Sequence, residues 1–234
     1  MTNVLNSHPD IHITYEMRTF LKIDQRHSEY WSTFRRLVCN SLRTRKFGRI
    51  LNIFYYLMLS IPYLGQKMTV ERIRMIKRSQ HPNMKIVGDK YPRYWFHLDK
   101  LSRHVSAIKV AIIYRDGRDV IASFFEKQRA DWSDKKWSVN LSSVNKVAQR
   151  WENAINIMEK QKDFIHVIRY EELVESPKKV LSGLARYLYV DAAQFDHRLI
   201  QKDKVGNYKN SLSLEELNAI NSEIGNTLVR LGYF

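Results

Sequence analysis

The segment from Ala107 to Phe125 reads AIKVAIIYRDGRDVIASFF and carries residue types well suited to binding an anion. An apolar run rich in β-branched residues leads into a polar turn and then into a helical pattern. A helix that starts directly after a strand directs backbone amides and the positive end of its dipole at the turn, which favours phosphate. Arg115 at the end of the strand and Arg118 in the turn can add charge-assisted hydrogen bonds, and Ser123 can add a hydroxyl donor.

The same turn has a second interpretation that needs no ligand. Arg118 can pair with Asp119 or Asp116 at the protein surface, as neighbouring opposite charges commonly do. Residue types alone give the two interpretations similar weight, so a phosphate site and a charged surface turn both stay open on this ground.

The turn sequence YRDGRDVIASF resembles the 3′-phosphate-binding segment of sulfotransferases that use 3′-phosphoadenosine-5′-phosphosulfate (PAPS). In that family an arginine and a serine eight residues later hold the phosphate, and Arg115 and Ser123 have this spacing. Other segments resemble the family in the expected order: LNSHPDIHITYEMR, GDKYPRYWFHLDKL and VIRYEELVESPKKVLSGLARYL. A weaker match, VGNYKNSLSLEEL, contains Lys209 and resembles the segment that closes over the 3′-phosphate. Together these segments span most of the chain.

The resemblance implies an α/β fold of the P-loop nucleotide-hydrolase type, in which helices flank a parallel sheet in three layers. Residues 1–234 would form a single sulfotransferase domain. The implied reaction moves a sulfuryl group from PAPS to an acceptor hydroxyl or amine and releases adenosine 3′,5′-bisphosphate, with no metal required. Acceptor pockets in the family are built from variable segments, here such as Ser28–Gln80, so the sequence does not identify the acceptor. A glycan or glycolipid is the first expectation, and a protein tyrosine is the second.

Two catalytic residues follow from the same resemblance. Lys90 in GDKYP matches the family lysine near the bridging oxygen of the donor, where it can stabilise developing negative charge. Glu16 in ITYE matches the glutamate that acts as general base in the tyrosyl-protein and some carbohydrate branches. Both residues also have plainer interpretations: Lys90 as a solvated neighbour of Asp89, and Glu16 as a partner of nearby basic residues, Arg18 or Lys22.

The remaining candidates surround the nucleotide or compete for the role of base. Tyr170 in RYEEL follows an apolar strand, and the family places this tyrosine near the adenine; with Arg169 and Glu171 it can equally well only cap the strand. His8 and His12 are alternative bases, although the HPD turn favours a structural role for His8. Four aromatic residues are expected to pack rather than to stack on a base: Trp95, Phe96, Trp132 and Trp137.

The sequence departs from the family at its start. The family's 5′-phosphosulfate loop, a turn rich in glycine, serine and threonine after the first strand, should lie just before the helix that ends in LNSHPD. Met1 falls inside that helix, and no comparable turn occurs elsewhere. We therefore expect the first strand and its loop to be missing from the chain as given, and the chain alone to lack transfer activity.

The elements that must position these residues alternate between two patterns. Short β-branched runs predict strands at Ile11–Tyr15, Lys85–Val87, Ala107–Tyr114 and Phe164–Ile168. Helical spacing lies between them, as in Val144–Met158, and the alternation favours a parallel sheet covered by helices. Ser176 before Pro177 predicts one helix start, and Ser213 with Glu216 predicts a capping box that opens another helix.

Composition narrows the class of protein and of partner. Thirty-nine Lys and Arg against 24 Asp and Glu leave a formal charge of +15, which favours polyanionic partners such as a phosphorylated nucleotide or an acidic glycan. The single cysteine, Cys39, allows no internal disulfide and no cysteine-rich metal site. The N-terminus has no secretory pattern, and Ile50–Leu64 is too short to span a bilayer, so we expect a buried helix there. A cytoplasmic protein is the first expectation, and a Golgi-lumen domain without its anchor is the alternative.

A competing class is a basic protein that binds nucleic acid or another polyanion without catalysis. Its surface would be built from clustered basic residues with interleaved aromatics, such as Arg35–Arg49 or Lys67–Arg78. Both clusters can equally be ordinary helix faces, and we expect no specific nucleic-acid partner. A third possibility is a remnant of the sulfotransferase fold that holds nucleotide and no longer catalyses.

Overall fold

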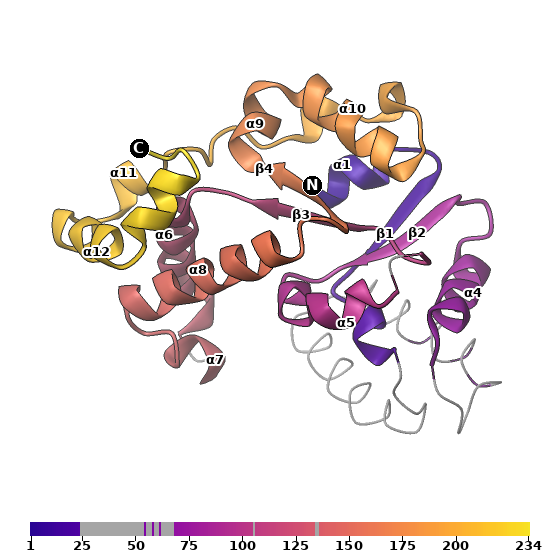
Figure 1. Ribbon diagram of the computed structural model, residues 1–234, viewed down its shortest axis with the longest axis horizontal. Helices are drawn as coiled ribbons and strands as arrows, with labels where there is room; N and C mark the ends of the chain where they lie inside the picture. Colours follow the sequence, from indigo (N-terminus) through magenta and orange to yellow (C-terminus); the bar gives the residue numbers. More distant parts are fainter. Residues whose placement is uncertain (24–53, 55–57, 59–60, 62–67, 105, 134–135) are drawn as a thin grey trace. The chain divides into compact units, whose positions relative to one another are not determined.

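A computed structural model of the chain describes residues 1–23, 54, 58, 61, 68–104, 106–133 and 136–234 (Figure 1). These residues form two compact units, which are described separately. One unit comprises Met1–Lys109 with Ala185–Leu199, and the other comprises Val110–Leu184 with Ile200–Phe234. The predicted single domain over residues 1–234 stays a prediction.

The first unit is built around a pair of parallel strands, β1 (Ile11–Tyr15) and β2 (Ile86–Lys90). The pairing runs in register from Ile11 opposite Ile86 to Tyr15 opposite Lys90. The unit's other elements are α1 (Thr2–Asn6), η1 (Thr19–Lys22), α4 (Val70–Gln80), η4 (Tyr94–His97), α5 (Leu98–Ser102), η6 (Ala192–Gln194) and η7 (His197–Leu199). Helix α4 begins where the Thr69 hydroxyl accepts the amide of Arg72, and it buries Ile73 and Ile76.

The second unit contains the other parallel pair, β3 (Val110–Tyr114) and β4 (Ile165–Arg169), in register from Val110 opposite Ile165 to Tyr114 opposite Arg169. The β3 strand runs directly into α6 (Gly117–Lys127), and β4 runs directly into α9 (Tyr170–Glu175). The remaining elements are the π-helical turn η5 (Gln128–Trp132), α7 (Lys136–Val139), α8 (Val144–Lys160), α10 (Pro177–Leu188), α11 (Tyr208–Ser211) and α12 (Leu214–Arg230). Helix α10 begins in this unit, and its last turn belongs to the first unit.

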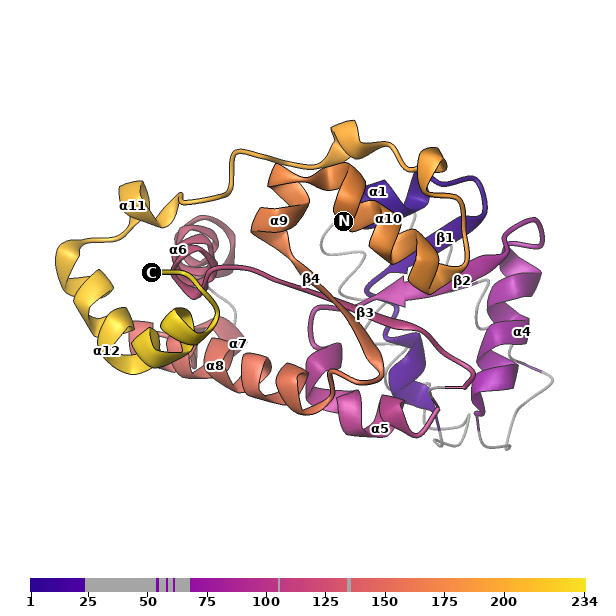
Figure 2. The ribbon, with the colours of Figure 1, turned by 45° about the horizontal axis from the view of Figure 1, so that its top comes forward.

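Helices α8 and α12 run side by side in the second unit and pack against α6 (Figures 1 and 2). Their apolar stripes meet in a core that includes Ile121, Trp151, Ile155, Ile220, Ile224 and Leu228. Each of the two helices has a side-chain N-cap, since Ser143 accepts the amide of Lys146 and Ser213 forms the predicted capping box with Glu216.

The four predicted strands and the helix at Val144–Met158 are confirmed, with boundaries that differ by a few residues. The strand β2 continues past its predicted end through Gly88 and Asp89 to Lys90, because its backbone ladder with β1 extends to Tyr15, and β3 begins at Val110 rather than at Ala107. An α/β arrangement with parallel strands is therefore correct. The predicted helix at Ile50–Leu64, the basic segment Arg35–Arg49 and Cys39 lie outside the described residues, apart from the single positions 54, 58 and 61. Across the described ranges, none of the helices combines the length and the apolar character needed to cross a bilayer.

Candidate functional site

Arg115 and Tyr170 occupy equivalent places at the carboxyl ends of neighbouring strands in the second unit. Tyr114 and Arg169 form the last pair of the β3/β4 ladder, and the two candidates are the next residues along each chain segment. The Arg115 guanidinium carbon lies 5.9 Å from the centre of the Tyr170 ring. Ligands of α/β folds gather at this edge of a parallel sheet, so the structure brings two predicted nucleotide-binding residues together there.

Arg115 turns its guanidinium toward the helix that carries Ser123. One terminal nitrogen, Nη2, donates a hydrogen bond to the carbonyl oxygen of Asp119, in the first turns of α6. In an α-helix the carbonyl of residue 119 faces the residue four positions later, which here is Ser123. The Arg115 guanidinium therefore contacts α6 within one turn of Ser123. The Nε of Arg115 is buried and has no hydrogen-bond partner among the described residues, which suits an anion as its missing acceptor.

Two backbone amides at the start of α6, those of Asp116 and Arg118, have carboxylate acceptors. The Asp116 carboxylate caps the helix by accepting the amide of Arg118 at 2.8 Å, and the Glu171 carboxylate accepts the amide of Asp116 at 2.9 Å. Two acidic side chains thus already use the positive end of this helix.

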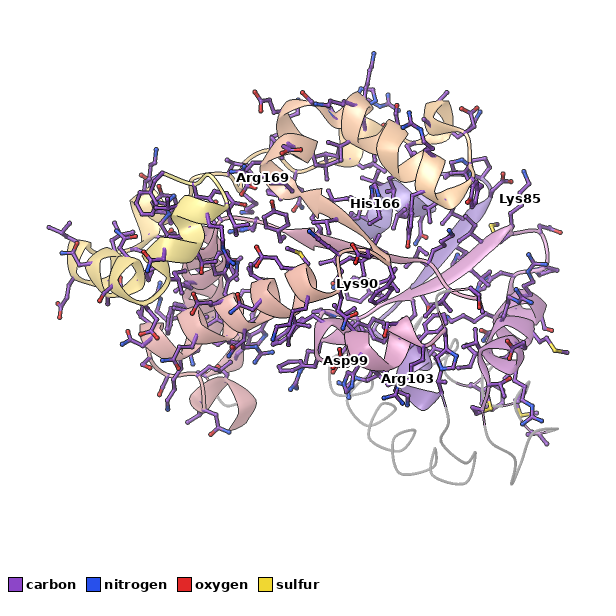
Figure 3. All side chains as sticks on the ribbon, in the orientation of Figure 1. Lys85, Lys90, Asp99, Arg103, His166 and Arg169 are labelled. Atoms are coloured by element: carbon purple, nitrogen blue, oxygen red, sulfur yellow. The ribbon has the colours of Figure 1, made fainter. Side chains whose placement is uncertain are left out.

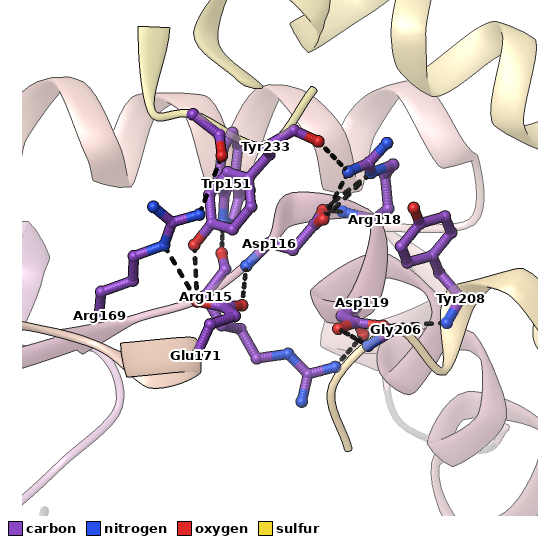
Figure 4. Close-up of polar contacts among 11 residues, drawn as sticks. Arg115, Asp116, Arg118, Asp119, Trp151, Arg169, Glu171, Gly206, Tyr208 and Tyr233 are labelled. Atoms are coloured by element: carbon purple, nitrogen blue, oxygen red, sulfur yellow. Dashed lines mark hydrogen bonds and ion pairs between the residues drawn. The ribbon is translucent and has the colours of Figure 1, made fainter. Parts of the chain in front are cut away.

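Arg118 is paired inside the protein (Figure 4). Its guanidinium makes hydrogen bonds of 2.7 to 3.2 Å with both carboxylate oxygens of Asp116 and donates to the Tyr233 carbonyl at 2.7 Å. The residue is only 8% exposed. Pairing with Asp116 is the ligand-free alternative raised by the sequence, although the pair is buried rather than on the surface. Binding of the nucleotide by Arg118 stays a prediction.

Lys209 lies on a segment that is fastened to α6 by Asp119. The Asp119 carboxylate, 1% exposed, accepts the amides of Gly206 and Tyr208 at 2.9 Å each (Figure 4). Gly206 has a φ of 75°, which glycine adopts without strain. Lys209 itself is exposed, one residue beyond the anchored part. The weakest of the sequence matches is therefore attached to the helix that carries Ser123.

The last residues of the chain fold back onto the same turn. The Tyr233 hydroxyl donates to Glu171 at 2.9 Å, and Arg169 donates to the Gly232 carbonyl at 3.1 Å while its Nε lies 3.5 Å from Glu171. Burial and the nearby Glu171 carboxylate raise the pKa of Tyr233, so its hydroxyl stays a proton donor. Sequence reasoning overlooked Tyr233 and the anchoring role of Asp119. The only local signal was an aromatic pair after Gly232, and it carries no information about a partner so distant in sequence.

The two predicted catalytic residues meet in the first unit. The Lys90 ammonium lies 3.8 Å from a Glu16 carboxylate oxygen, and both side chains are about one-third exposed, at 37% and 30%. The Glu16 amide also donates to the Lys90 carbonyl at 2.7 Å, immediately after the last pair of the β1/β2 ladder. Lys90 further donates to the Tyr15 hydroxyl at 3.1 Å. A carboxylate and an ammonium are thus adjacent at the carboxyl end of two parallel strands.

Asp89 and His8, which the sequence places beside the catalytic candidates, have structural partners of their own. Lys90 does not pair with Asp89, whose carboxylate instead accepts the amides of Met17 and Thr19. His8 has the expected structural role, because it is 2% exposed, its Nδ1 accepts the amide of Asp10, and its Nε2 lies 3.1 Å from the Asp191 carbonyl.

His12, the other alternative base, stacks on the ring of His81 at 3.7 Å. Burial and the nearby charge of Lys77 lower the pKa of His12. No three His, Cys, Asp or Glu side chains come together as a metal site in the portion of the chain that the structure covers.

Comparison with known proteins identifies the fold. The profile of the family described as the sulfotransferase family matches residues 1–194. A sulfotransferase domain from the olefin synthase of Synechococcus PCC 7002 superimposes with a TM-score of 0.54 at 14% identity, covering 94% of this chain and 89% of that one. The sulfotransferase STF9 from Mycobacterium avium gives a TM-score of 0.54 at 13% identity, covering 98% of this chain and 72% of that one. No curated protein matches the chain.

Proposed function

The chain belongs to the sulfotransferase family, and we propose that it transfers a sulfuryl group from PAPS to a hydroxyl or an amine of a glycan, a glycolipid or a protein tyrosine. The family match establishes a sulfotransferase, whereas PAPS as the donor and the classes of acceptor are proposed in addition. The observation that supports it is the place of Arg115 directly after β3, where its guanidinium contacts α6 within one turn of Ser123.

The nucleotide half of the donor suits the second unit. Arg115 offers a charge-assisted hydrogen bond from its unpartnered Nε, and Ser123 offers a hydroxyl, which together match a 3′-phosphate. Tyr170, 5.9 Å from the Arg115 guanidinium, has an aromatic face for the adenine. Lys209 adds a charge from the segment anchored by Asp119. Arg118 supports the site through the turn that its pair with Asp116 stabilises.

The chemistry requires a base for the acceptor and a cation for the leaving group. In the proposed reaction the acceptor oxygen attacks sulfur, and its proton passes to the Glu16 carboxylate, a contribution of roughly 10² to 10⁴ in rate. The bond between sulfur and the bridging oxygen breaks, and the electron pair stays on the 5′-phosphate of the departing adenosine 3′,5′-bisphosphate. Lys90 stabilises the charge that develops there. A direct Glu16–Lys90 contact supports this division of roles, because it gives both groups a fixed place beside each other.

The proposal is tested by separating binding from transfer. Arg115→Ala should weaken binding of adenosine 3′,5′-bisphosphate severely and Ser123→Ala modestly, whereas Glu16→Gln should lower transfer of labelled sulfate from PAPS far more than it lowers affinity. Arg198→Ala is the matched control, since this exposed arginine in the first unit pairs only with Asp196 among the described residues. Unchanged nucleotide affinity in both Arg115→Ala and Ser123→Ala would defeat the assignment.

A charge of +15 gives the competing, non-catalytic function its one supporting observation. Binding to a general polyanion depends on counterion release and weakens steeply with salt, whereas a defined nucleotide site depends on it less. Titrations with DNA and with adenosine 3′,5′-bisphosphate at rising salt distinguish the two. Tight nucleotide binding without transfer to any acceptor in a mixed panel would identify a nucleotide-binding remnant of the fold.

A further inference from the structure

The Asp89 side chain binds the turn that presents Glu16. Its carboxylate accepts the amide of Met17 at 3.0 Å and the amide of Thr19 at 2.8 Å, so it fastens the residues that directly follow Glu16. The hydroxyl of Tyr94 donates to the same carboxylate at 2.6 Å. The Asp89 carboxylate therefore links the end of β2 to the turn after β1, although Asp89 and Met17 are 72 positions apart in sequence.

That turn has a backbone conformation that needs such support. Glu16 has a φ of 54° and Arg18 a φ of 55°, both in the left-handed region that residues with a side chain rarely adopt. Each such residue costs on the order of 1 to 3 kcal/mol and persists only where surrounding contacts hold it. The two amides that Asp89 accepts belong to the residues that alternate with these positions. Asp89 is thus placed to hold the turn in the conformation that directs Glu16 to Lys90.

The charge of Asp89 is compensated from within the unit. Lys77, 2% exposed, donates to the Thr14 hydroxyl at 2.7 Å, and that hydroxyl lies 3.3 Å from Asp89 and donates to the Gly88 carbonyl at 3.0 Å. Burial lowers the pKa of Lys77 to about 8, and the Asp89 charge opposes this shift. A buried lysine, a threonine and a tyrosine therefore surround Asp89, which is the kind of supporting shell that keeps a catalytic geometry fixed.

Asp89 and Lys90 are adjacent residues of β2 and contact different groups. Successive side chains of a strand point to opposite faces, so Asp89 points to the side of Thr14 and Lys77 while Lys90 points to the other side. On that other side the Lys90 ammonium meets Tyr15 and Glu16. We propose that Asp89 is a positioning residue, which does not touch the substrate and instead fixes Glu16 beside Lys90; this rests on the proposed roles of those two residues.

The central experiment is Asp89→Asn, which keeps the shape and removes the charge. Because a small displacement of a reacting group can cost as much as 10²-fold, turnover should fall by roughly ten- to a hundredfold. The KM for PAPS and the affinity for adenosine 3′,5′-bisphosphate should stay within about twofold of wild type. A double-mutant cycle adds a more specific readout: in a Glu16→Gln background, Asp89→Asn should cause little further loss, because its effect passes through Glu16.

A second readout does not depend on catalysis. Amide hydrogen exchange at Met17 and Thr19 should become faster in Asp89→Asn, since both amides lose a charged acceptor. Asp10→Asn is the matched control because Asp10 pairs with Lys85 at 2.6 Å. Figure 3 shows Lys85 far from Lys90, toward the other end of β2. Asp10→Asn should leave both turnover and the exchange of these amides unchanged. If Asp89→Asn does not fold, Tyr94→Phe removes one hydrogen bond from the same carboxylate and should give a smaller loss of the same kind.

The outcomes separate this inference from the proposed function. A wild-type protein that binds no adenosine 3′,5′-bisphosphate would reject the proposed function. If the wild-type chain binds the nucleotide but transfers no sulfate, as its sequence predicts, the amide exchange at Met17 and Thr19 tests the inference by itself. With an active wild-type protein, two results would reject the inference alone. One is full turnover in Asp89→Asn. The other is a double variant whose fold-loss of turnover equals the product of the two single losses, because Asp89 would then act independently of Glu16. Unchanged exchange at Met17 and Thr19 would likewise show that Asp89 does not hold the turn.

Discussion

The Asp119 carboxylate and the Tyr208 amide form a 2.9 Å hydrogen bond across 89 positions of sequence. The same carboxylate holds Gly206, and the Asp119 carbonyl accepts the Arg115 guanidinium. One residue on α6 therefore connects the segment of Lys209 to the arginine proposed to bind the 3′-phosphate. The two parts of the proposed nucleotide site thus meet at one residue, the Lys209 segment through the Asp119 side chain and Arg115 through the Asp119 main-chain carbonyl.

Asp119→Asn should weaken the nucleotide site and the fold together. The amide group keeps one oxygen acceptor but offers a donor where the second backbone amide needs an acceptor, and hydrogen bonds to a charged group contribute about 1.5 to 3 kcal/mol each. We expect a stability loss of about 2 kcal/mol and a clear fall in affinity for adenosine 3′,5′-bisphosphate, measured by urea unfolding and calorimetry. Asp163→Asn, at an exposed position of the same unit, is the control and should change neither quantity.

Arg115 and Arg118 should respond in opposite ways to alanine substitution. Arg115→Ala should remove nucleotide affinity while circular dichroism and melting temperature stay near wild type. Arg118→Ala leaves the buried Asp116 carboxylate and the Tyr233 carbonyl without a cationic partner, and breaking a buried pair costs about 3 to 5 kcal/mol. The measurement is a paired comparison of melting temperature and Kd. An Arg118→Ala protein with native stability and lost affinity would show instead that Arg118 contacts the nucleotide directly.

Gly117→Ala should destabilise the protein although alanine is the better helix former. A Cβ at this position would lie 2.8 Å from Ile224 Cδ1 and 2.9 Å from Trp151 Cδ2, and overpacking of this kind costs about 1 to 3 kcal/mol. Displacing Trp151 would also disturb its 3.2 Å hydrogen bond to the Arg115 carbonyl. Gly225→Ala is a direct control on α12, because a Cβ added there would meet no atom of the described residues within 4 Å beyond its own helix backbone and chain neighbours. It should stabilise by about 0.5 to 1 kcal/mol in the same urea titration.

Local patterns predicted the elements of this protein well because local physics determines them. The strands at Ile11–Tyr15 and Phe164–Ile168 and the capping box of Ser213 with Glu216 each depend on residues within one short segment. The resemblance to a family indicated which side chains were candidates for the site. The structure brings Glu16 to Lys90 and Arg115 to Tyr170, as expected for residues at the ends of paired parallel strands.

The contacts that hold these side chains in place could not be predicted in the same way. Asp89 and Asp119 each bind two backbone amides that are distant in sequence, and a carboxylate gives no local sign of which amides it will accept. At the start of α6 the amide of the N-cap residue Asp116 is bound by Glu171, which follows another strand and is 55 positions away in sequence. Such choices depend on tertiary packing, which a pattern along one segment does not contain.

Lys77 should make the stability of the protein depend on pH in the alkaline range. Its folded-state pKa of about 8 lies below the ordinary value of 10.5, so the unfolded chain binds more protons between these values. The free energy of unfolding should therefore rise as pH increases from about 8 toward 10, by up to about 3 kcal/mol for a single group. Folding raises the pKa of Tyr94 and Tyr233, so above about pH 10 the unfolded chain loses their protons first. Their contribution lowers the free energy of unfolding as pH rises in that range and opposes the trend set by Lys77.

The Lys77 contribution is isolated by comparing variants over that window. Lys77→Met preserves most of the side-chain volume and has no charge to lose, so its unfolding free energy should change less between about pH 8 and 10 than that of wild type. Lys85→Met removes an exposed lysine and should keep the wild-type slope. Parallel pH curves for wild type and Lys77→Met would mean that Lys77 is not buried as an ammonium, and the compensation of Asp89 by this lysine would then have to be abandoned.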